Sequence, residues 1–524
     1  MFVKLHLLDI LAIAVYMVAT ALIGVYFSRR NKSTEEYFVG GRSFPGWVIG
    51  LSLVGTGISS VTFLAYPADA FKTSWIRYLP NVLMPLAVLI AAYFFLPFFR
   101  RGKITSAYEY LEDRFGVSVR LYGSASYIVR GLIRISIMLY LVSILFNQVT
   151  NLSLPVCIII AGIFVTFYTV LGGIDAVIWT DVIQTIVLVS GALLCLGVVI
   201  YHLPGGIGQI FNVAIEHGKL SFSEWVNGDL IPISWKVSLS KKTGSMMMLF
   251  GLTIWLTMYS SEQETIQRYC ASKSIKEARK GMFWVVAASL PIWAFFMFLG
   301  TSLFVFFHHS PTPESAAMLS GDIKAEHVLP YFIINFLPPG ISGLVIAAAL
   351  AAAMSSLDSI INAISTVLTI DFFKPHLIKG KTDAYYLRLA RMFALLTGGI
   401  MIGGALLLSI TETKTLEHTA LVLASILISG RLGLYLLGFF TTIGDARAVW
   451  TGLAFSFLFT LWSVLSENNI LPESLTVPFD LYYTGIVGNI IIFFVGFFTA
   501  VLIPAKKRDL TNLSIWTQDG TPLQ

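Results

Sequence analysis

A carboxylate and several hydroxyls lie in the middle of one long apolar stretch, Gly343 to Asp371. On a helix of 3.6 residues per turn they would form a stripe on one face, with Asp358 at its border. The stripe comprises Ala352, Ser355, Ser356, Ser359, Asn362 and Ala363. An ionisable group inside a bilayer costs roughly 2.5–3.5 kcal/mol, so the pattern predicts a functional site. Clustered oxygen atoms suit a small cation, whereas a small-residue face for close helix packing is the alternative.

The composition indicates a membrane protein with many spans. Of 524 residues, 56% are hydrophobic and 12% are charged, whereas about 25% are charged in soluble domains. Cys157, Cys195 and Cys270 lie in or beside apolar runs and show neither metal-ligand spacing nor a disulfide framework. The net charge of +6 is explained by basic loops between spans, so we expect no nucleic-acid partner.

Runs of about 20 apolar residues predict thirteen spans. They lie near residues 8–27, 46–70, 78–99, 120–147, 153–171, 178–202, 245–263, 281–308, 329–370, 390–410, 418–441, 447–466 and 479–503. Loops on one side, to which we assign Arg100, Arg114, Arg120 and Arg268, hold most of the 35 basic residues. The positive-inside rule then places the C-terminus in the cytoplasm and the N-terminus outside.

The connecting segments give the expected domain organisation. Residues 1–504 are predicted to form one transmembrane domain, and residues 505–524 a short cytoplasmic tail. The largest outside loop, 201–243, is expected to hold short helices. The charged segment 104–116 is predicted to be an amphipathic helix at the inner surface.

The second span is interrupted by Gly55-Thr56-Gly57, near the bilayer midplane at 1.5 Å per residue. A broken helix at that depth needs a cavity beside it, because lipid cannot satisfy the freed carbonyls. Carbonyls around Gly55 and Ile58 could hold a cation. The new helix start, with Ser59, Ser60 and Thr62, could bind an anion. A glycine-mediated helix contact is the alternative.

Three arginines lie within predicted spans, at positions 130, 134 and 431. Because a guanidinium fits a carboxylate, we expect Arg134 to bind the solute. Arg130 is expected to be structural, snorkelling or pairing with acids near the inner surface. Asn81 is a further polar candidate for the solute, and Arg431 for a gate ion pair.

The sixth span opens with Asp181, which the topology places in the same half of the membrane as Asp358. Two buried carboxylates must share a proton or a cation, or lie well apart. The alternative for Asp181 is a cap on the start of the span.

Several segments resemble the sodium:solute symporter family over nearly the whole chain. They are EEYFVGGR at 35–42, ITSAYEYLEDRF at 104–115, YTVLGGIDAVIWTDVIQ at 168–184, IQR at 266–268 and AAAMSSLDSIINAISTVLTIDFF at 351–373. The resemblance implies an all-α polytopic membrane protein with the leucine-transporter-like 5+5 inverted-repeat fold. Span 8–27 would precede the repeats, at about 46–202 and 245–441, and two spans, 447–503, would follow.

The same resemblance implies a sodium site between the broken helix and the eighth core helix. Its ligands would be the carbonyls of Gly55, Ile58 and Ala352 and the hydroxyls of Ser355 and Ser356. Some members hold a second sodium ion nearby, at positions that correspond to Asp181, Ser355, Asp358 and Ser359. Those members carry a hydroxyl where this chain has Asp358, so a second sodium ion, a proton and a structural hydrogen bond stay open there.

Within the family the chain is most similar to the bacterial sialic acid transporters. Ser59, Ser60, Thr62 and Arg134 fall where those proteins contact the sugar acid, and Asn81 stands where they have Gln. This implies sodium-coupled import of a small organic solute, a sugar acid such as sialic acid, across a bacterial inner membrane. Membrane lipid would surround the protein, and no obligate protein partner is evident.

Other functions remain as alternatives. The solute could instead be a neutral sugar or a monocarboxylate. An alternative of another functional class is a membrane solute sensor without transport. No HExxH, GxSxG or P-loop motif is present, so we expect no enzyme activity.

Overall fold

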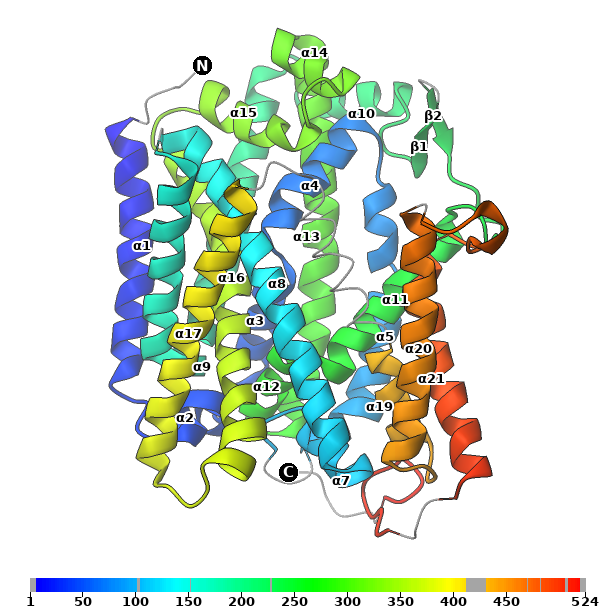
Figure 1. Cartoon of the computed structure of the whole chain (residues 1–524). Coiled ribbons are helices and arrows are strands. Elements are labelled where there is room, and N and C mark those ends of the chain that lie inside the picture. The colour runs from blue at the N-terminus through cyan, green and yellow to red at the C-terminus, as the bar shows by residue number, and fades with distance from the viewer. Residues whose placement is uncertain are drawn as a thin grey trace.

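Long apolar helices run between two ends of a bundle (Figure 1). The computed structural model describes residues 6–100, 104–150, 152–226, 229–410, 430–468, 470–480, 482–504 and 508–518, with residues 61, 148 and 149 described by their backbone alone. One end carries α10 (Gly206–Glu216), α14 (Pro313–Ser320), α15 (Val328–Phe336) and the hairpin β1 (Ser223–Val226) and β2 (Asp229–Pro232), and we name it the α14 end. The α2 end carries α2 (Thr34–Val39), α7 (Glu109–Phe115) and the C-terminal segment.

The remaining helices follow the predicted runs closely. They are α1 (Leu7–Ser28), α3 (Gly46–Gly57), α4 (Ser60–Lys72), η2 (Ile76–Asn81), α5 (Met84–Ile90), η3 (Ala91–Phe95), α6 (Leu96–Arg100), α8 (Val117–Thr150), α9 (Leu154–His202), α11 (Gly244–Ser261), α12 (Gln263–Ala271), α13 (Ile275–His309), α16 (Ile341–Val367), η5 (Leu368–Leu377), α17 (Asp383–Ile410), α19 (Arg431–Phe440), α20 (Ala446–Glu467) and α21 (Tyr482–Leu502). Short 3-10 turns complete the set, at Gly40–Arg42, Ala325–His327 and Glu473–Leu475.

Among the described residues, nine helices are long and apolar enough to cross a membrane, or ten if the bent pair α3–α4 is one span. The count of thirteen is not tested, because most of the predicted span 418–441 lies outside the described residues. The 49-residue α9 covers two predicted spans.

Gly173 divides α9 into two runs that lie along α16. Its φ of 56° and ψ of −155° are not helical, and a Cβ there would lie 2.7 Å from the Tyr37 ring. Tyr168, before the break, and Thr180, after it, both contact Asp358. The chain therefore turns back at Gly173, near the α2 end, as the two predicted spans require.

The predicted break in the second span is present, one residue later than expected. Ile58 and Ser59 are extended, and the helices on either side meet at 59°. Gly55 and Gly57 lie in the last turn of α3 and weaken it, and the helix ends at Gly57. The carbonyls of that turn have no partner within the helix.

A second break was missed. The seventh span was predicted to end at 263, where the chain becomes charged, but α11 breaks at Glu262 and continues as α12. Every side chain of α12 is buried. The placement of Arg268 in a loop is therefore wrong: its side chain is 1% exposed and lies in the core. Its charge is accepted there because polar partners surround it.

Three other predictions need correction. The predicted span 329–370 is two helices, since Gly340 with φ 88° separates α15 from α16. Arg100, Arg114 and Arg120 lie in helices at the α2 end, and each is at most 8% exposed. Arg120 donates to Asp371 at 2.6 Å, which ties α8 to η5. The segment 104–116 contains the predicted helix, α7, but it packs under the bundle and is more buried than an interfacial helix would be.

The predicted outside loop 201–243 contains the short helix α10 and the hairpin, in which Ser223 pairs with Pro232. Lys219, which follows α10, donates to the carbonyls of Phe71 and Lys72 at 2.8 and 3.0 Å. This loop therefore holds the C-terminal end of α4.

Close helix crossings give the first test. A Cβ on Gly300 of α13 would lie 2.2 Å from the carbonyl oxygen of Pro67 in α4. We expect Gly300→Ala to lower the free energy of unfolding by about 1–3 kcal/mol, because the two backbones must move apart. The measurement is thermal and denaturant unfolding of the purified protein. Gly399→Ala on α17 is the control, since a Cβ there meets no atom within 4 Å. Equal stability of the two variants would contradict this crossing.

Candidate functional site

Oxygen atoms of α3 and α16 meet where α3 ends. The Ser355 hydroxyl lies 2.9 Å from the Gly55 carbonyl oxygen and 3.2 Å from the Ala352 carbonyl oxygen. The Ser356 hydroxyl lies 3.2 Å from the Thr56 carbonyl oxygen. All of these residues are buried. Carbonyl and hydroxyl oxygens are the donors that hard cations prefer, so this set fits sodium.

Four of the five predicted sodium ligands are therefore brought together. The fifth, Ile58, is buried at the break, but Ser356 reaches the carbonyl of Thr56 instead. Gly55 is required by space, since a Cβ there would lie 2.8 Å from the Thr185 hydroxyl of α9. Three helices thus converge on this point.

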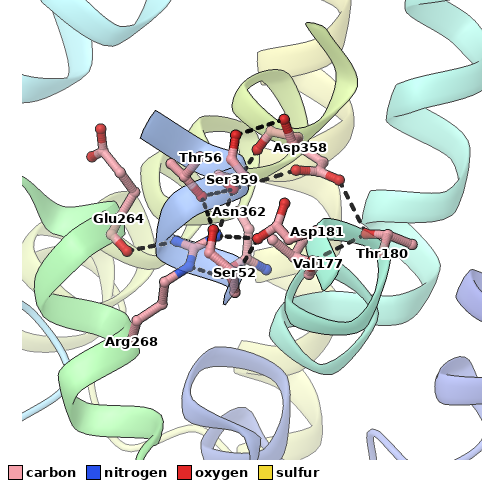
Figure 2. A network of polar contacts seen from close by, with 12 residues as sticks. Ser52, Thr56, Val177, Thr180, Asp181, Glu264, Arg268, Asp358, Ser359 and Asn362 are labelled. Carbon is pink, nitrogen blue, oxygen red and sulfur yellow. Dashed lines mark hydrogen bonds and ion pairs between the residues drawn. The ribbon is translucent and has the colours of Figure 1, made fainter. Parts of the chain in front are cut away.

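A network of charged groups lies one turn from these oxygens (Figure 2). Asp181 accepts from the Ser52 hydroxyl at 2.5 Å and from the Arg268 Nη2 at 2.6 Å. Arg268 Nη2 also donates to the Ser359 hydroxyl at 2.7 Å. Because Asp181 lies inside the helix and pairs with Arg268, the alternative of a cap at the start of the span is wrong.

Asp358 lies on the far side of Ser359 in the same network (Figure 2). Its Oδ2 accepts from the Tyr168 hydroxyl at 2.8 Å and from the Thr180 hydroxyl at 3.3 Å, and its Oδ1 lies 3.3 Å from the Ser359 hydroxyl. Asp358 and Asp181 are both fully buried. The two carboxylates that the sequence placed in one half of the membrane are therefore neighbours through Ser359 and Arg268.

The charges of this network do not cancel. When ionised, Asp181 and Asp358 carry two negative charges, and Arg268 supplies one positive charge. Asp181 Oδ1 is buried and has no hydrogen-bond partner among the described residues. A buried excess charge must be met by a bound cation or by a proton.

A second charged cluster surrounds the break between α11 and α12. Glu262 accepts from Arg431 at 2.8 Å and also pairs with Arg130. Glu264 accepts from the Tyr127 hydroxyl at 2.6 Å and lies 3.4 Å from Arg134 Nη1. Among the described residues, three arginines thus meet two glutamates, which leaves one positive charge without a negative partner. The three arginines within spans are explained by these pairs, and the acid that meets Arg130 lies in the core rather than at the inner surface.

The second cluster lies in the wall of a cavity of about 530 Å³. Gly57, Arg130, Arg134, Glu262 and Glu264 line its deep part. Glu467 at the end of α20 and Thr484 at the start of α21 line the part toward the α14 end. Arg134, with a side chain 34% exposed, is the least covered of the three arginines.

The other predicted solute residues lie around the first break. Ser59 precedes α4, Ser60 and Thr62 are in its first turn, and the buried Ser60 hydroxyl has no partner among the described residues. Asn81 Nδ2 donates to the Tyr66 hydroxyl at 2.8 Å. Of the five predicted solute residues, only Arg134 is among the described residues that line the cavity. Gly57, which precedes the break, also lines it, whereas Ser59, Ser60, Thr62 and Asn81 do not.

Sequence reasoning missed Glu262, Glu264, Tyr168 and the inward position of Arg268. The sequence held a signal for Glu262 and Glu264. Three arginines within predicted spans need acidic partners, and these two acids directly follow an apolar run. No local signal marks Tyr168, because a tyrosine is common in an apolar helix and does not by itself indicate a polar contact.

Comparisons with known proteins find matches over most of the chain. The model of the sodium:solute symporter family matches residues 37–453. The sodium/sialic acid symporter NanT of Aliivibrio fischeri is 31% identical over 508 residues, which cover 96% of this chain and 94% of that protein. The sodium/sialic acid symporter SiaT of Proteus mirabilis is 31% identical over 504 residues, which cover 95% and 96%.

A solved structure extends the likeness to three dimensions. It is the substrate-bound outward-open state of a Na⁺-coupled sialic acid symporter, with a TM-score of 0.83 and 29% identity, covering 96% of this chain and 99% of that one. The expected leucine-transporter-like fold is therefore confirmed.

The pairing of Arg268 gives a test of the charged network. We expect Arg268→Met to lower the free energy of unfolding by about 3–5 kcal/mol, because it leaves two buried carboxylates without a positive partner. Adding Asp181→Asn should recover more than half of this loss, since the excess charge returns to its original size. Unfolding of both variants in detergent is the measurement. If the double variant were as unstable as Arg268→Met, the pairing would not carry the stability assigned to it.

Proposed function

Because the chain belongs to the sodium:solute symporter family, we propose that it imports a sugar acid, a sialic acid, together with sodium ions. One central site would be exposed to each side of the membrane in turn. The membrane gradient of sodium would supply the free energy for uphill uptake of the solute.

The observation that carries the choice of an acidic solute is the position of Arg134. Arg130 and Arg431 are held by Glu262. Within the part of the chain that the structure describes, the one ion pair of Arg134 is a long contact with Glu264, and Arg134 lines the cavity. The cluster has one positive charge in excess, and a carboxylate would cancel it. A guanidinium can donate two parallel hydrogen bonds to a carboxylate, which gives orientation as well as affinity.

Hydroxyl groups of the solute would meet the first break. Ser60 offers a buried hydroxyl without a partner among the described residues, and Ser59 and Thr62 lie beside it at the start of α4. The N-terminal end of α4 adds backbone N–H groups that favour a negative solute group. Asn81 completes the set from η2, and its partner Tyr66 would fix its orientation.

The size of the cavity separates the candidate solutes. About 530 Å³ lies within the range of about 300–1,000 Å³ that holds drug-sized ligands. A small monocarboxylate would leave much of this volume to water, and a neutral sugar would leave the excess positive charge unmet. These two solutes are the outcomes that the binding test below must exclude, and uptake into proteoliposomes would exclude a sensor without transport.

Sodium would bind first where α3 meets α16, through Gly55, Ala352, Ser355 and Ser356, with Ile58 at the break. A second sodium ion or a proton would occupy the network of Asp181, Asp358 and Ser359, because that network has one negative charge in excess. Each positive charge that enters adds roughly 2.3 kcal/mol of driving force at a membrane potential of 100 mV.

The proposed orientation follows the basic residues. The α2 end would face the cytoplasm of a bacterium, with the C-terminus, and the α14 end would face outward, with the N-terminus. In this orientation the cavity, whose lining includes the end of α20 and the start of α21, would receive solute from outside. Membrane lipid would surround the bundle, whose outer helices expose large apolar side chains.

The test is equilibrium binding to the purified protein, with and without sodium, of a sialic acid, a neutral hexose and pyruvate. We expect sodium-dependent binding of the sialic acid. Arg134→Ala should weaken it by about 10- to 100-fold, the equivalent of 1.5–3 kcal/mol for a hydrogen bond to a charged group. Binding of a neutral hexose, if any, should change far less.

Arg447→Ala is the control, because this arginine pairs with Asp445 away from the cavity. Equal weakening of acidic and neutral solutes by Arg134→Ala would reject the acidic solute. Binding of all three solutes without any effect of sodium would reject symport.

A further inference from the structure

One short helix, α12, joins the two charged clusters. Its first turn carries Glu264, which lines the solute cavity beside Arg134. Its next turn carries Arg268, which contacts Ser52, Asp181 and Ser359. Figure 2 shows Glu264 and Arg268 on the same helix, joined by a hydrogen bond. About one turn of helix, from Glu264 to Arg268, thus separates the solute side from the cation side.

The two turns are locked to each other. Arg268 Nη1 donates to the backbone carbonyl of Glu264 at 2.6 Å. The guanidinium therefore cannot shift without moving the backbone that carries the Glu264 carboxylate. Gln267, between them, donates to Asn362 and Thr366 of α16 at 2.8 and 3.0 Å. The helix is attached directly to the one that carries Ser355 and Ser356.

The contacts continue from Arg268 to the proposed sodium ligands. The Ser359 hydroxyl, which accepts from Arg268, donates to the carbonyl of Ser355 at 2.7 Å and lies 3.2 Å from the Thr56 hydroxyl. Ser355 in turn contacts the carbonyl of Gly55. A cation bound to these oxygens would move them, and the position of the Ser359 hydroxyl that accepts from Arg268 would change with them.

At the solute side of α12, Glu264 lines the cavity. Glu264 holds one donor firmly, the Tyr127 hydroxyl, and reaches Arg134 at 3.4 Å. A small displacement of Glu264 toward Arg134 would shorten that contact and fix the guanidinium in the cavity wall. Glu262, clamped by Arg130 and Arg431, has no such freedom.

We infer that α12 is the element through which sodium and solute change each other's affinity, with Glu264 and Arg268 as its positioning residues. Occupation of the oxygens at α3 and α16 orders Arg268, which sets Glu264 and so places Arg134 for the solute. The inference rests on the proposed function, because it assumes that both ligands bind where that proposal puts them. It adds the physical route of coupling, which follows hydrogen-bonded groups with named partners.

The test measures the coupling factor, the ratio of solute dissociation constants without and with saturating sodium. The probe is N-acetylneuraminate, titrated by calorimetry into the full-length protein in nanodiscs. Coupling factors are typically about 5- to 150-fold. In Glu264→Gln, which keeps the size of the side chain but removes its charge, we expect the factor to fall at least about fivefold toward one.

A second measurement, of sodium affinity, distinguishes a role in coupling from a purely structural role. Sodium affinity in the absence of solute should stay within about twofold of the wild-type value, because Glu264 touches no proposed sodium ligand. In the same variant, solute should also lose its effect on sodium affinity. Because linkage is reciprocal, the loss should equal the loss of the effect of sodium on solute affinity. Glu473→Gln is the control: Glu473 is exposed in the 3-10 turn Glu473–Leu475 and is not among the described residues that line the cavity, so coupling should be unchanged.

Arg268→Lys is a second variant, which keeps the charge but loses the planar fork that reaches Ser52, Asp181 and Ser359 together. We expect it to lose coupling and to weaken sodium binding as well. If this variant does not fold, Glu264→Gln still decides the matter.

The outcomes separate this inference from the proposed function. A wild-type protein whose solute binding ignores sodium would reject both. A wild-type protein that shows coupling, with a Glu264→Gln variant that loses solute affinity equally with and without sodium, would reject the route through α12 alone.

Discussion

Charge buried in the membrane interior must be compensated, and this constraint organises the structure. Among the described residues, the core holds two charged clusters. When their groups are ionised, the cluster with Asp181 and Asp358 has one unpaired negative charge, and the cluster with Arg134 has one unpaired positive charge. An excess charge in a low-dielectric environment is unstable unless a counter-ion meets it. A sodium ion or a proton at the first cluster and a carboxylate at the second would leave the interior neutral. Cation and anionic solute are thus complementary ligands of one protein.

Two broken helices make this arrangement possible. The break after α3 frees carbonyls for a cation, and the break at Glu262 brings two carboxylates into a segment where an unbroken apolar helix would have none. Both breaks lie in the protein interior, where α16, almost entirely buried, packs against them. Movement of either broken helix changes the distance between oxygen atoms of different helices, so the geometry of the sites depends on the conformational state. Differential binding in two states is what coupling requires.

Much of this could be predicted from the sequence, for reasons of pattern. Apolar runs of span length, the glycines around Thr56 and the polar stripe on α16 each have a local signature, and they led to the first cluster. The second cluster could not be found in the same way. A charged segment after an apolar run reads as a loop, so α12 and Arg268 were placed outside the core. Only the spatial proximity of Arg130, Arg134 and Arg431 shows why Glu262 and Glu264 are tolerated.

The central claim is that sodium is held where α3 ends against α16, and its most direct test is sodium dependence of sialic acid uptake in proteoliposomes. With Ser355 and Ser356 both changed to Ala, the sodium concentration for half-maximal uptake should rise by about tenfold or more, the equivalent of 1.4 kcal/mol in binding. Ser365→Ala, on the same helix but bonded to the Ala390 carbonyl of α17, should leave it unchanged. An unchanged half-saturating sodium concentration in the double variant would contradict the account.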